Sequence, residues 1–174
     1  MKAHNFEQKF RCEDLDAVVR LCRESRYRFH ARLVQKDIFF DVKTGRLKVR
    51  QIDGGRTELI HYFRPNRKGP RKCAYVRVPV GGEPNDIIGI LKSVAGIVGI
   101  VKKKRTVYYH ENVRIHIDRV EKLGDFVELE AEIRGRYKKG LALALLKSTK
   151  AALKLDDRNA VERSYIDLLE AKKQ

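Results

Sequence analysis

A period of two between apolar and polar side chains dominates this chain and predicts β-strands. The clearest stretch is residues 111–132, in which three β-branched residues alternate with polar ones before a turn at residues 122–125. The chain then returns in a second strand, one face of which carries Phe126, Glu128, Glu130 and Glu132. The pattern predicts a β-hairpin with one apolar face and one face rich in ionised side chains.

The same alternation recurs in six further segments, so we expect eight strands in all. The six segments cover residues 3–11, 27–42, 46–52, 57–64, 71–79 and 97–109. Apolar stripes with helical spacing predict helices over residues 13–25 and 83–96, and a helical tail from about residue 141. Short turns join most neighbouring strands in the order βα-ββββ-α-βββ-αα, which predicts an antiparallel sheet without βαβ crossovers.

Nearly every predicted strand has ionised side chains on one face and apolar side chains on the other. The ionic faces collect seven bases and four acids: Glu7, Lys9, Lys48, Arg50, Arg64, Lys103, Arg105, Arg114, Asp118, Glu128 and Glu130. Two architectures fit this pattern. Either the apolar faces pack together as a sandwich and the ions face water, or the sheet closes into a barrel whose ions line a wet interior and whose apolar outside is covered by helices. The pattern alone leaves both open.

The net charge indicates an anionic partner. The 174 residues include 39 Lys and Arg against 23 Asp and Glu, which gives a formal net charge of +16. This excess is typical of proteins that bind nucleotides, polyphosphates, nucleic acids or membrane surfaces, and it does not choose among them. If the ionised side chains line a closed interior, a polyphosphate with a divalent metal would balance them, because bases bind phosphate oxygens and carboxylates bind hard cations.

Further observations predict the cellular compartment and exclude some classes of partner. The three cysteines are far apart and show no CxxC spacing, so we expect a reducing, cytoplasmic environment. The longest apolar runs, at residues 94–101 and 141–146, are too short to span a bilayer, so we expect no membrane partner. The basic run at residues 102–105 and the basic loop at residues 65–70 are interpreted as phosphate-lining or exposed segments, so nucleic acid is not the expected partner.

Several segments, taken in order, resemble the signature blocks of a known family. They are NFEQK at residues 5–9, QKDIFFD at 35–41, GRLKVR at 45–50, ELIHYFRP at 58–65, RKCAY at 71–75, VKKKRTVYY at 101–109, RIHIDRVEKLGDFVELE at 114–130 and RSYIDLL at 163–169. On these blocks the chain resembles the CYTH superfamily, also called triphosphate tunnel metalloenzymes, which contains class IV adenylyl cyclases, thiamine triphosphatases and inorganic triphosphatases. The blocks extend over almost the whole length, so we expect residues 1–174 to form a single CYTH-like domain.

The resemblance implies an α+β fold in which an eight-stranded antiparallel β-barrel forms a hydrophilic tunnel, with helices packed on the outside. It implies that seven bases hold ATP or another triphosphate or polyphosphate, four of them in catalysis (Lys9, Arg50, Arg64 and Arg105) and three in substrate binding (Lys48, Lys103 and Arg114). It also implies that Mg²⁺ or Mn²⁺ is held by the carboxylates of Glu7, Asp118, Glu128 and Glu130. Catalysis of this kind is mostly positioning and charge neutralisation.

One position departs from the family pattern. The first Glu of the family's ExExK signature is Asn5 here, and a neutral carbonyl oxygen is a weaker ligand for a hard cation than a carboxylate. Three functions therefore stay open: a class IV-type adenylate cyclase that converts ATP to cyclic AMP and pyrophosphate; a triphosphatase acting on inorganic, thiamine or nucleoside triphosphates; and a non-catalytic binder of polyphosphate or nucleotide. A homodimer is suggested only by analogy with the cyclases.

The histidines and tyrosines are expected to have structural roles. The five histidines show no metal-ligand spacing and are predicted to pack or to lie at the surface, although His116 is placed where it could line the tunnel. Tyr108, Tyr109 and Tyr165 are predicted to pack. The sequence has no GxxxxGK[ST] loop, so phosphate binding would come from side chains and not from a helix N-terminus.

Overall fold

The structure, a computed structural model, describes residues 2–67 and 69–173. Met1 and Gln174, the ends of the expected domain, and Lys68 of the basic loop lie outside the described residues. The described elements are β1 (Lys2–Arg11), α1 (Leu15–Glu24), β2 (Arg28–Phe40), β3 (Arg46–Ile52), β4 (Arg56–Phe63), β5 (Arg71–Val80), α2 (Pro84–Ala95), β6 (Ile97–His110), β7 (Val113–Val120), β8 (Gly124–Glu132), α3 (Lys139–Ala152), the 3₁₀ turn η1 (Asp157–Asn159) and α4 (Tyr165–Ala171). This order confirms the predicted succession of strands and helices.

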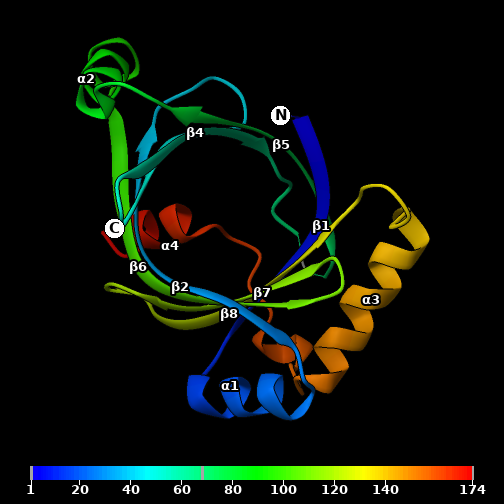
Figure 1. The fold of residues 1–174 in the computed structure, drawn as a ribbon. Coiled ribbons are helices and arrows are strands. Elements are labelled where there is room, and N and C mark those ends of the chain that lie inside the picture. Colours follow the sequence, from blue (N-terminus) through cyan, green and yellow to red (C-terminus); the bar gives the residue numbers. More distant parts are fainter. Residues whose placement is uncertain (1, 68, 174) are drawn as a thin grey trace.

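The eight strands close into an antiparallel barrel with the order β1-β5-β4-β3-β2-β6-β7-β8 (Figure 1). Closure depends on β1, which pairs with β5 through Asn5 and Cys73 and with β8 through Glu7 and Glu130. Elsewhere β2 pairs with β6 along its whole length, although a helix and three strands separate them in the sequence. The barrel decides between the two architectures that the sequence left open, and it is the one whose ionised faces point inward.

Three helices cover the apolar outside of this barrel (Figure 1). Helices α1 and α3 pack on β1, β7 and β8 through a cluster that includes Phe10, Ile115 and Leu146. Helix α2 packs on the outside of β2 and β3, where Ile87 and Leu91 contact a smaller cluster. Burial of such surface contributes about 25 cal/mol per Å² of apolar area, so these contacts stabilise a barrel whose interior is polar. Within the described residues, the helices are too short or too polar to cross a membrane.

Helix α4 differs from the other three because it lies at one open end of the barrel (Figure 1). Its start is fixed by a capping box, in which the Ser164 hydroxyl accepts from the Asp167 N–H and the Asp167 carboxylate accepts from the Ser164 N–H. The adjacent Tyr165 packs edge to face on Phe126, with 5.0 Å between the ring centroids. These rings and Phe39 belong to one apolar cluster at this end of the barrel, which confirms the packing role predicted for Tyr165.

Candidate active site

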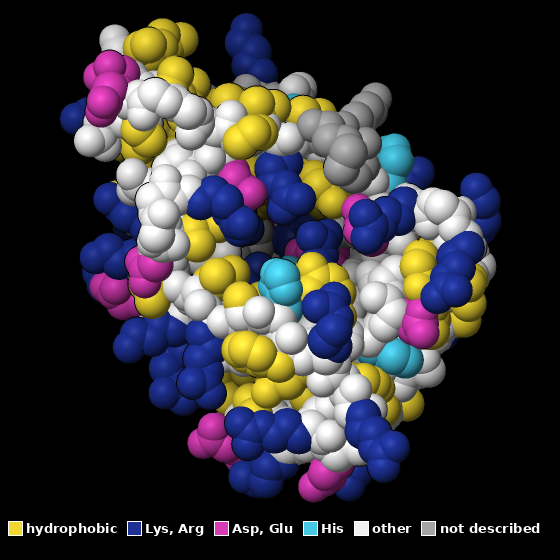
Figure 2. Space-filling view, in the orientation of Figure 1, with side chains coloured by type: hydrophobic (Ala, Val, Ile, Leu, Met, Phe, Trp, Pro, Cys, Tyr) yellow, Lys and Arg dark blue, Asp and Glu magenta, His cyan; other side chains and the backbone are white. Residues whose placement is uncertain are grey.

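The barrel encloses a cavity of about 320 Å³ that is lined by inward-facing side chains from all eight strands. Figure 2 looks into its open end, where Lys and Arg side chains surround the hollow. Ten of the eleven predicted site residues line this cavity: Glu7, Lys9, Lys48, Arg50, Arg64, Lys103, Arg105, Arg114, Glu128 and Glu130. The eleventh, Asp118, lies outside its lining.

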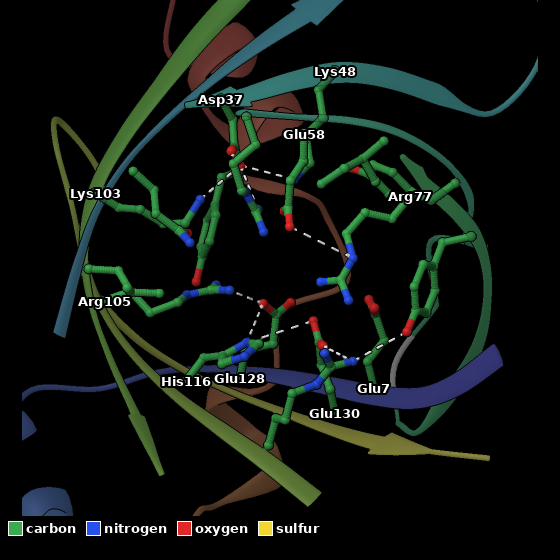
Figure 3. A pocket seen from close by; sticks show the side chains of 18 of the residues that line it. Glu7, Asp37, Lys48, Glu58, Arg77, Lys103, Arg105, His116, Glu128 and Glu130 are labelled. Carbon is green, nitrogen blue, oxygen red and sulfur yellow. Dashed lines mark hydrogen bonds and ion pairs between the residues drawn. The ribbon is translucent and has the colours of Figure 1, made fainter. Parts of the chain in front are cut away.

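One wall of the cavity is built around Asp37 of β2 (Figure 3). Its carboxylate accepts hydrogen bonds from Lys48 at 2.9 Å, from Arg50 at 2.7 and 2.8 Å, and from Lys103 at 2.8 Å. The strand that carries Lys48 and Arg50 begins after Gly45, whose φ is 71°, and a Cβ there would lie 2.8 Å from a backbone oxygen of β4. Only glycine fits this turn without strain. We call Asp37, Lys48, Arg50 and Lys103 the basic wall.

Burial makes the charges of the basic wall costly unless each one is paired. Burial opposes ionisation of Asp37, but Arg50, followed by Lys103 and Lys48, holds the pKa of this carboxyl well below its usual range. Burial is also the largest influence on Lys103, and it lowers the pKa of this amine to about 7. Lys103 is therefore close to losing its proton at neutral pH, and a phosphate beside it would favour the charged form.

The opposite wall carries Glu7, His116, Glu128 and Glu130, which we call the acidic wall (Figure 3). Strand register brings these side chains together. His116 of β7 lies opposite Glu128 of β8, and Glu7 of β1 lies opposite Glu130 of β8. Because alternate residues of a strand point to the same side, Glu128 and Glu130 both face the cavity.

The two glutamates of β8 each have bases beside them. Lys9 and Arg105 approach the Glu128 carboxylate at 3.5 and 3.2 Å, and Arg114 approaches that of Glu130 at 3.2 Å. Burial opposes ionisation of Glu128, but Lys9 and its other neighbours hold the pKa of this carboxyl well below its usual range. Glu128 is therefore ionised at neutral pH and available as an anionic ligand.

Glu7 is held by a different pair of bases. One of its carboxylate oxygens accepts hydrogen bonds from Arg64 at 3.0 Å and from Arg71 at 3.3 Å. Burial, followed by repulsion from Glu128, raises the pKa of Glu7, so a cation close to this carboxylate would favour its charged form. Arg71 is only 1% exposed and was not among the predicted site residues, because a strand pattern does not distinguish a buried arginine from one that faces water.

Asp118, which the resemblance implied as a metal ligand, is placed differently. It is fully buried and accepts two hydrogen bonds from Arg105, at 2.6 and 2.5 Å, and one from the Tyr165 hydroxyl at 2.8 Å. The register explains this position, because Asp118 of β7 lies directly opposite Arg105 of β6. Asp118 thus fixes the guanidinium of Arg105, which also contacts the Glu128 carboxylate at 3.2 Å, and its role as a metal ligand stays a prediction.

The donor atoms of the acidic wall fit a divalent metal. One ligand atom each of His116, Glu128 and Glu130 lies within 4.8 Å of the others. Among the described residues, Nδ1 of His116 has no hydrogen-bond partner, and the same is true of the buried Oδ1 of Asn5. Burial, followed by Arg105, lowers the pKa of His116, so the imidazole is neutral at pH 7 and its nitrogen can donate a lone pair.

Two residues of the walls were not recognised as site residues in the sequence. Asp37 lies in the predicted strand over residues 27–42, but its contact with Lys103 spans 66 positions and joins strands that are not consecutive. His116 was allowed to line the tunnel and is confirmed to do so. Its proximity to Glu128 depends on hairpin register, which a search for metal-ligand spacing does not detect.

Comparisons with known proteins agree with this geometry. A family model described as the CYTH domain matches residues 3–165. A Methanocaldococcus jannaschii protein named "putative adenylate cyclase" is 26% identical over 175 residues, which cover 93% of this chain and 96% of that protein. A solved structure from Pyrococcus horikoshii matches with a TM-score of 0.82 at 23% identity and covers 94% of this chain and 98% of its own. A Hippeastrum structure, described as a "putative adenylyl cyclase" with a dominant triphosphatase activity, matches with a TM-score of 0.65 at 14% identity over 100% of this chain and 97% of its own.

Proposed function

Since the chain belongs to the CYTH domain family, we propose that it is a metal-dependent enzyme that acts on triphosphates inside its barrel. The observation that carries the proposal is a buried cavity in which a basic wall faces an acidic wall. All eight strands supply lining residues, so in this proposal the chain acts as one domain.

The bases would bind the triphosphate through its oxygens. Lys48, Arg50 and Lys103 already donate to one carboxylate, Asp37, and their bonds to phosphate would be of the same charge-assisted kind. The cavity volume of about 320 Å³ is at the low end of small-molecule sites. We therefore place the triphosphate inside the cavity and any attached nucleoside toward the open end.

The acidic wall would hold Mg²⁺ or Mn²⁺ through Glu7, Glu128 and Glu130, because carboxylate oxygens suit hard cations. When bound, the metal withdraws charge from phosphoryl oxygens and so eases attack on phosphorus. Arg105 would add a positive charge whose position Asp118 fixes before the substrate arrives. Such preorganised charge is usually a large contribution to catalysis.

The first candidate reaction is that of an adenylate cyclase. The 3′-hydroxyl of ATP attacks the α-phosphorus, and pyrophosphate leaves. It is supported by the name of the Methanocaldococcus jannaschii relative, which matches nearly the whole chain. Purified protein incubated with ATP and Mn²⁺ or Mg²⁺ should form cyclic AMP and pyrophosphate in equal amounts, which anion-exchange chromatography resolves. Release of orthophosphate without cyclic AMP would contradict this assignment.

The second candidate is hydrolysis of a terminal phosphate by water. It is favoured by the size of the cavity, which suits a bare triphosphate, and by the activity described for the Hippeastrum structure. Inorganic triphosphate incubated with the protein and metal should then release one orthophosphate for each pyrophosphate formed. Measuring the rates on ATP and on inorganic triphosphate in the same preparation separates the two reactions.

Asn5 favours a third outcome, which is binding without turnover. The variant Asn5→Glu restores a carboxylate beside Glu7 on the same face of β1. If both forms bind inorganic triphosphate in calorimetry and only Asn5→Glu forms product, the natural chain is a binder. Product formation by the natural chain would exclude that outcome.

A further inference from the structure

His116 has a position in the cavity that a metal site built from carboxylates alone leaves unexplained. Its side chain is only 8% exposed, and its Nδ1 lies 3.7 Å from Oε2 of Glu128 and 3.7 Å from Oε1 of Glu130 (Figure 3). These distances are too long for hydrogen bonds. The nitrogen therefore faces two carboxylate oxygens at ion-pair distance and forms a hydrogen bond with neither.

Several buried polar atoms lack a hydrogen-bond partner among the described residues, and they include Nδ1 of His116, Oδ1 of Asn5 and Nε of Arg114. Leaving a buried polar atom unpaired costs about 1–3 kcal/mol. Native structures usually satisfy such atoms with protein, water or an ion. A cation between the imidazole and the two carboxylates would satisfy Nδ1 and would offset the repulsion between the carboxylates.

The spacing of the three donors is compatible with one ion. Two atoms that each lie about 2.1 Å from the same metal can be no more than about 4.2 Å apart. Both separations from the His116 nitrogen, at 3.7 Å, are within this limit. The ligand atoms of all three residues lie within 4.8 Å of one another, so a small rotation of a glutamate side chain would complete the set.

The neighbouring charges leave room for a metal on the imidazole side. Arg114 contacts Oε2 of Glu130, whereas Oε1 of the same carboxylate faces the imidazole. Lys9 contacts Oε1 of Glu128, whereas Oε2 faces the imidazole and is shared with Arg105. The bases thus hold each carboxylate in an orientation that directs one oxygen at His116.

We infer that His116 is a nitrogen ligand of the divalent metal, together with Glu128 and Glu130. This inference rests on the proposed function in that the metal is the one that serves the triphosphate, and it adds a ligand and a metal class. The imidazole supplies a donor in a site where Asn5 offers only a neutral oxygen. Because imidazole is a softer ligand than carboxylate, the site selects transition metals such as Mn²⁺, Co²⁺ or Zn²⁺ over Mg²⁺.

Binding of Mn²⁺ to the whole chain without nucleotide tests this inference. An electron paramagnetic resonance titration gives the affinity, and pulsed measurements detect the ¹⁴N nucleus of a coordinated imidazole. The natural chain should show this nitrogen coupling. His116→Asn should lose the coupling, bind Mn²⁺ at least about tenfold more weakly and release it at lower Mg²⁺ concentrations. The matched control is His30→Asn, an exposed histidine of the same cavity lining, which should keep the coupling and the affinity.

Each outcome of these measurements supports or contradicts the inference or the proposed function. Mn²⁺ bound by the natural chain without nitrogen coupling would overturn the inference and leave the proposed function intact. That spectrum needs no variant, so a His116→Asn chain that failed to fold would not obscure it. Failure of the Mn²⁺-loaded chain to bind inorganic triphosphate in calorimetry would refute the proposed function, while nitrogen coupling would still support the ligand. Absence of Mn²⁺ binding would refute both the inference and the metal dependence.

Discussion

The basic wall and the acidic wall of the cavity bury their charges in different ways (Figure 3). On the basic wall three cations converge on one carboxylate, Asp37, and every contact is between 2.7 and 2.9 Å. On the acidic wall the nitrogen of His116 and the carboxylate oxygens that face it are 3.7 Å apart and form no hydrogen bond. The basic wall is paired around one carboxylate, whereas the imidazole nitrogen of the acidic wall has no hydrogen-bond partner among the described residues.

In the proposed function, this difference means that the two walls would bind their ligands in different ways. Asp37 occupies the position of an anion, so the basic wall stays assembled before a phosphate arrives, and the phosphate must share or replace the bonds of this carboxylate. On the acidic wall, Lys9 contacts Oε1 of Glu128 and Arg114 contacts Oε2 of Glu130, while the other oxygen of each carboxylate faces His116. In the proposed function, a phosphate would therefore compete with Asp37, whereas a metal would meet carboxylate oxygens that already point at an imidazole.

Breaking the basic wall at its centre should have the largest effect. Asp37→Asn keeps the size of the side chain but leaves Lys48, Arg50 and Lys103 without a counter-charge, which should lower the free energy of unfolding by about 3–5 kcal/mol. Chemical denaturation at low ionic strength measures this change. Inorganic triphosphate should restore part of the loss, because its oxygens replace the carboxylate. Asp41→Asn, an exposed acid just beyond the same strand, should cost less than about 0.5 kcal/mol, and equal losses would contradict the counter-ion role.

Removing a single base should affect binding more than folding, because Asp37 keeps its other two partners. Lys48→Ala should weaken binding of inorganic triphosphate by about 10–100-fold, since a hydrogen bond to a charged group contributes about 1.5–3 kcal/mol. Arg114→Ala should act in the same direction from the acidic wall. Calorimetry measures both, with the exposed Lys172→Ala as the control that should change little. Similar weakening in all three would indicate a diffuse basic surface in place of a cavity.

Binding of inorganic triphosphate should depend on pH because of Lys103 on the basic wall. The pKa of this amine is about 7, so above that pH the folded chain holds a neutral amine where a triphosphate requires a charged one. Affinity for inorganic triphosphate should fall as the pH rises from about 7 to about 9, by at most about tenfold per unit. Lys103→Arg keeps its charge over this range and should flatten the profile. Titrations at constant ionic strength check this, and parallel profiles would assign the effect to another group.

The smallest effect is expected at the end of the barrel that carries α4, where Tyr165 lies close to two lysines. Its ring lies 3.8 Å from Nζ of Lys9 and 5.8 Å from Nζ of Lys103. Ser164→Ala removes the cap that starts the helix of Tyr165 and should cost about 1 kcal/mol. Hydrogen exchange over residues 165–171 should become faster than in Ser93→Ala, an exposed change within α2. Unchanged exchange would show that packing alone holds this end.

Residues of odd and even number along a strand point to opposite faces, and we call this property strand parity. It predicted much of the site because, in a barrel, alternate residues face the interior. This is why ten of the predicted residues line the cavity. Parity does not predict depth along the barrel axis. Asp118 shares its parity with Arg114 and His116, yet it lies opposite Arg105, bonds to the Tyr165 hydroxyl and is outside the cavity lining.

Partners on non-consecutive strands were also beyond the sequence pattern. The basic wall needs β6 beside β2, and the direct pairing of these two strands brings Lys103 to Asp37. The alternation along the inward faces of β2 and β8 thus differed in how well it identified site residues. Glu128 and Glu130 stand out because acids are repeated on one strand, whereas Asp37 is flanked on its own face by Gln35 and Phe39.

The apolar plug of Phe126 and Tyr165 has a consequence for the order of events in the barrel. If this cluster leaves the cavity a single opening, a ligand enters end-on and its products leave by the same route. Long polyphosphate chains would therefore be gripped by their termini and shortened from there, never cut in the middle. A nucleotide would enter phosphates first, so recognition of the base would be left to the rim.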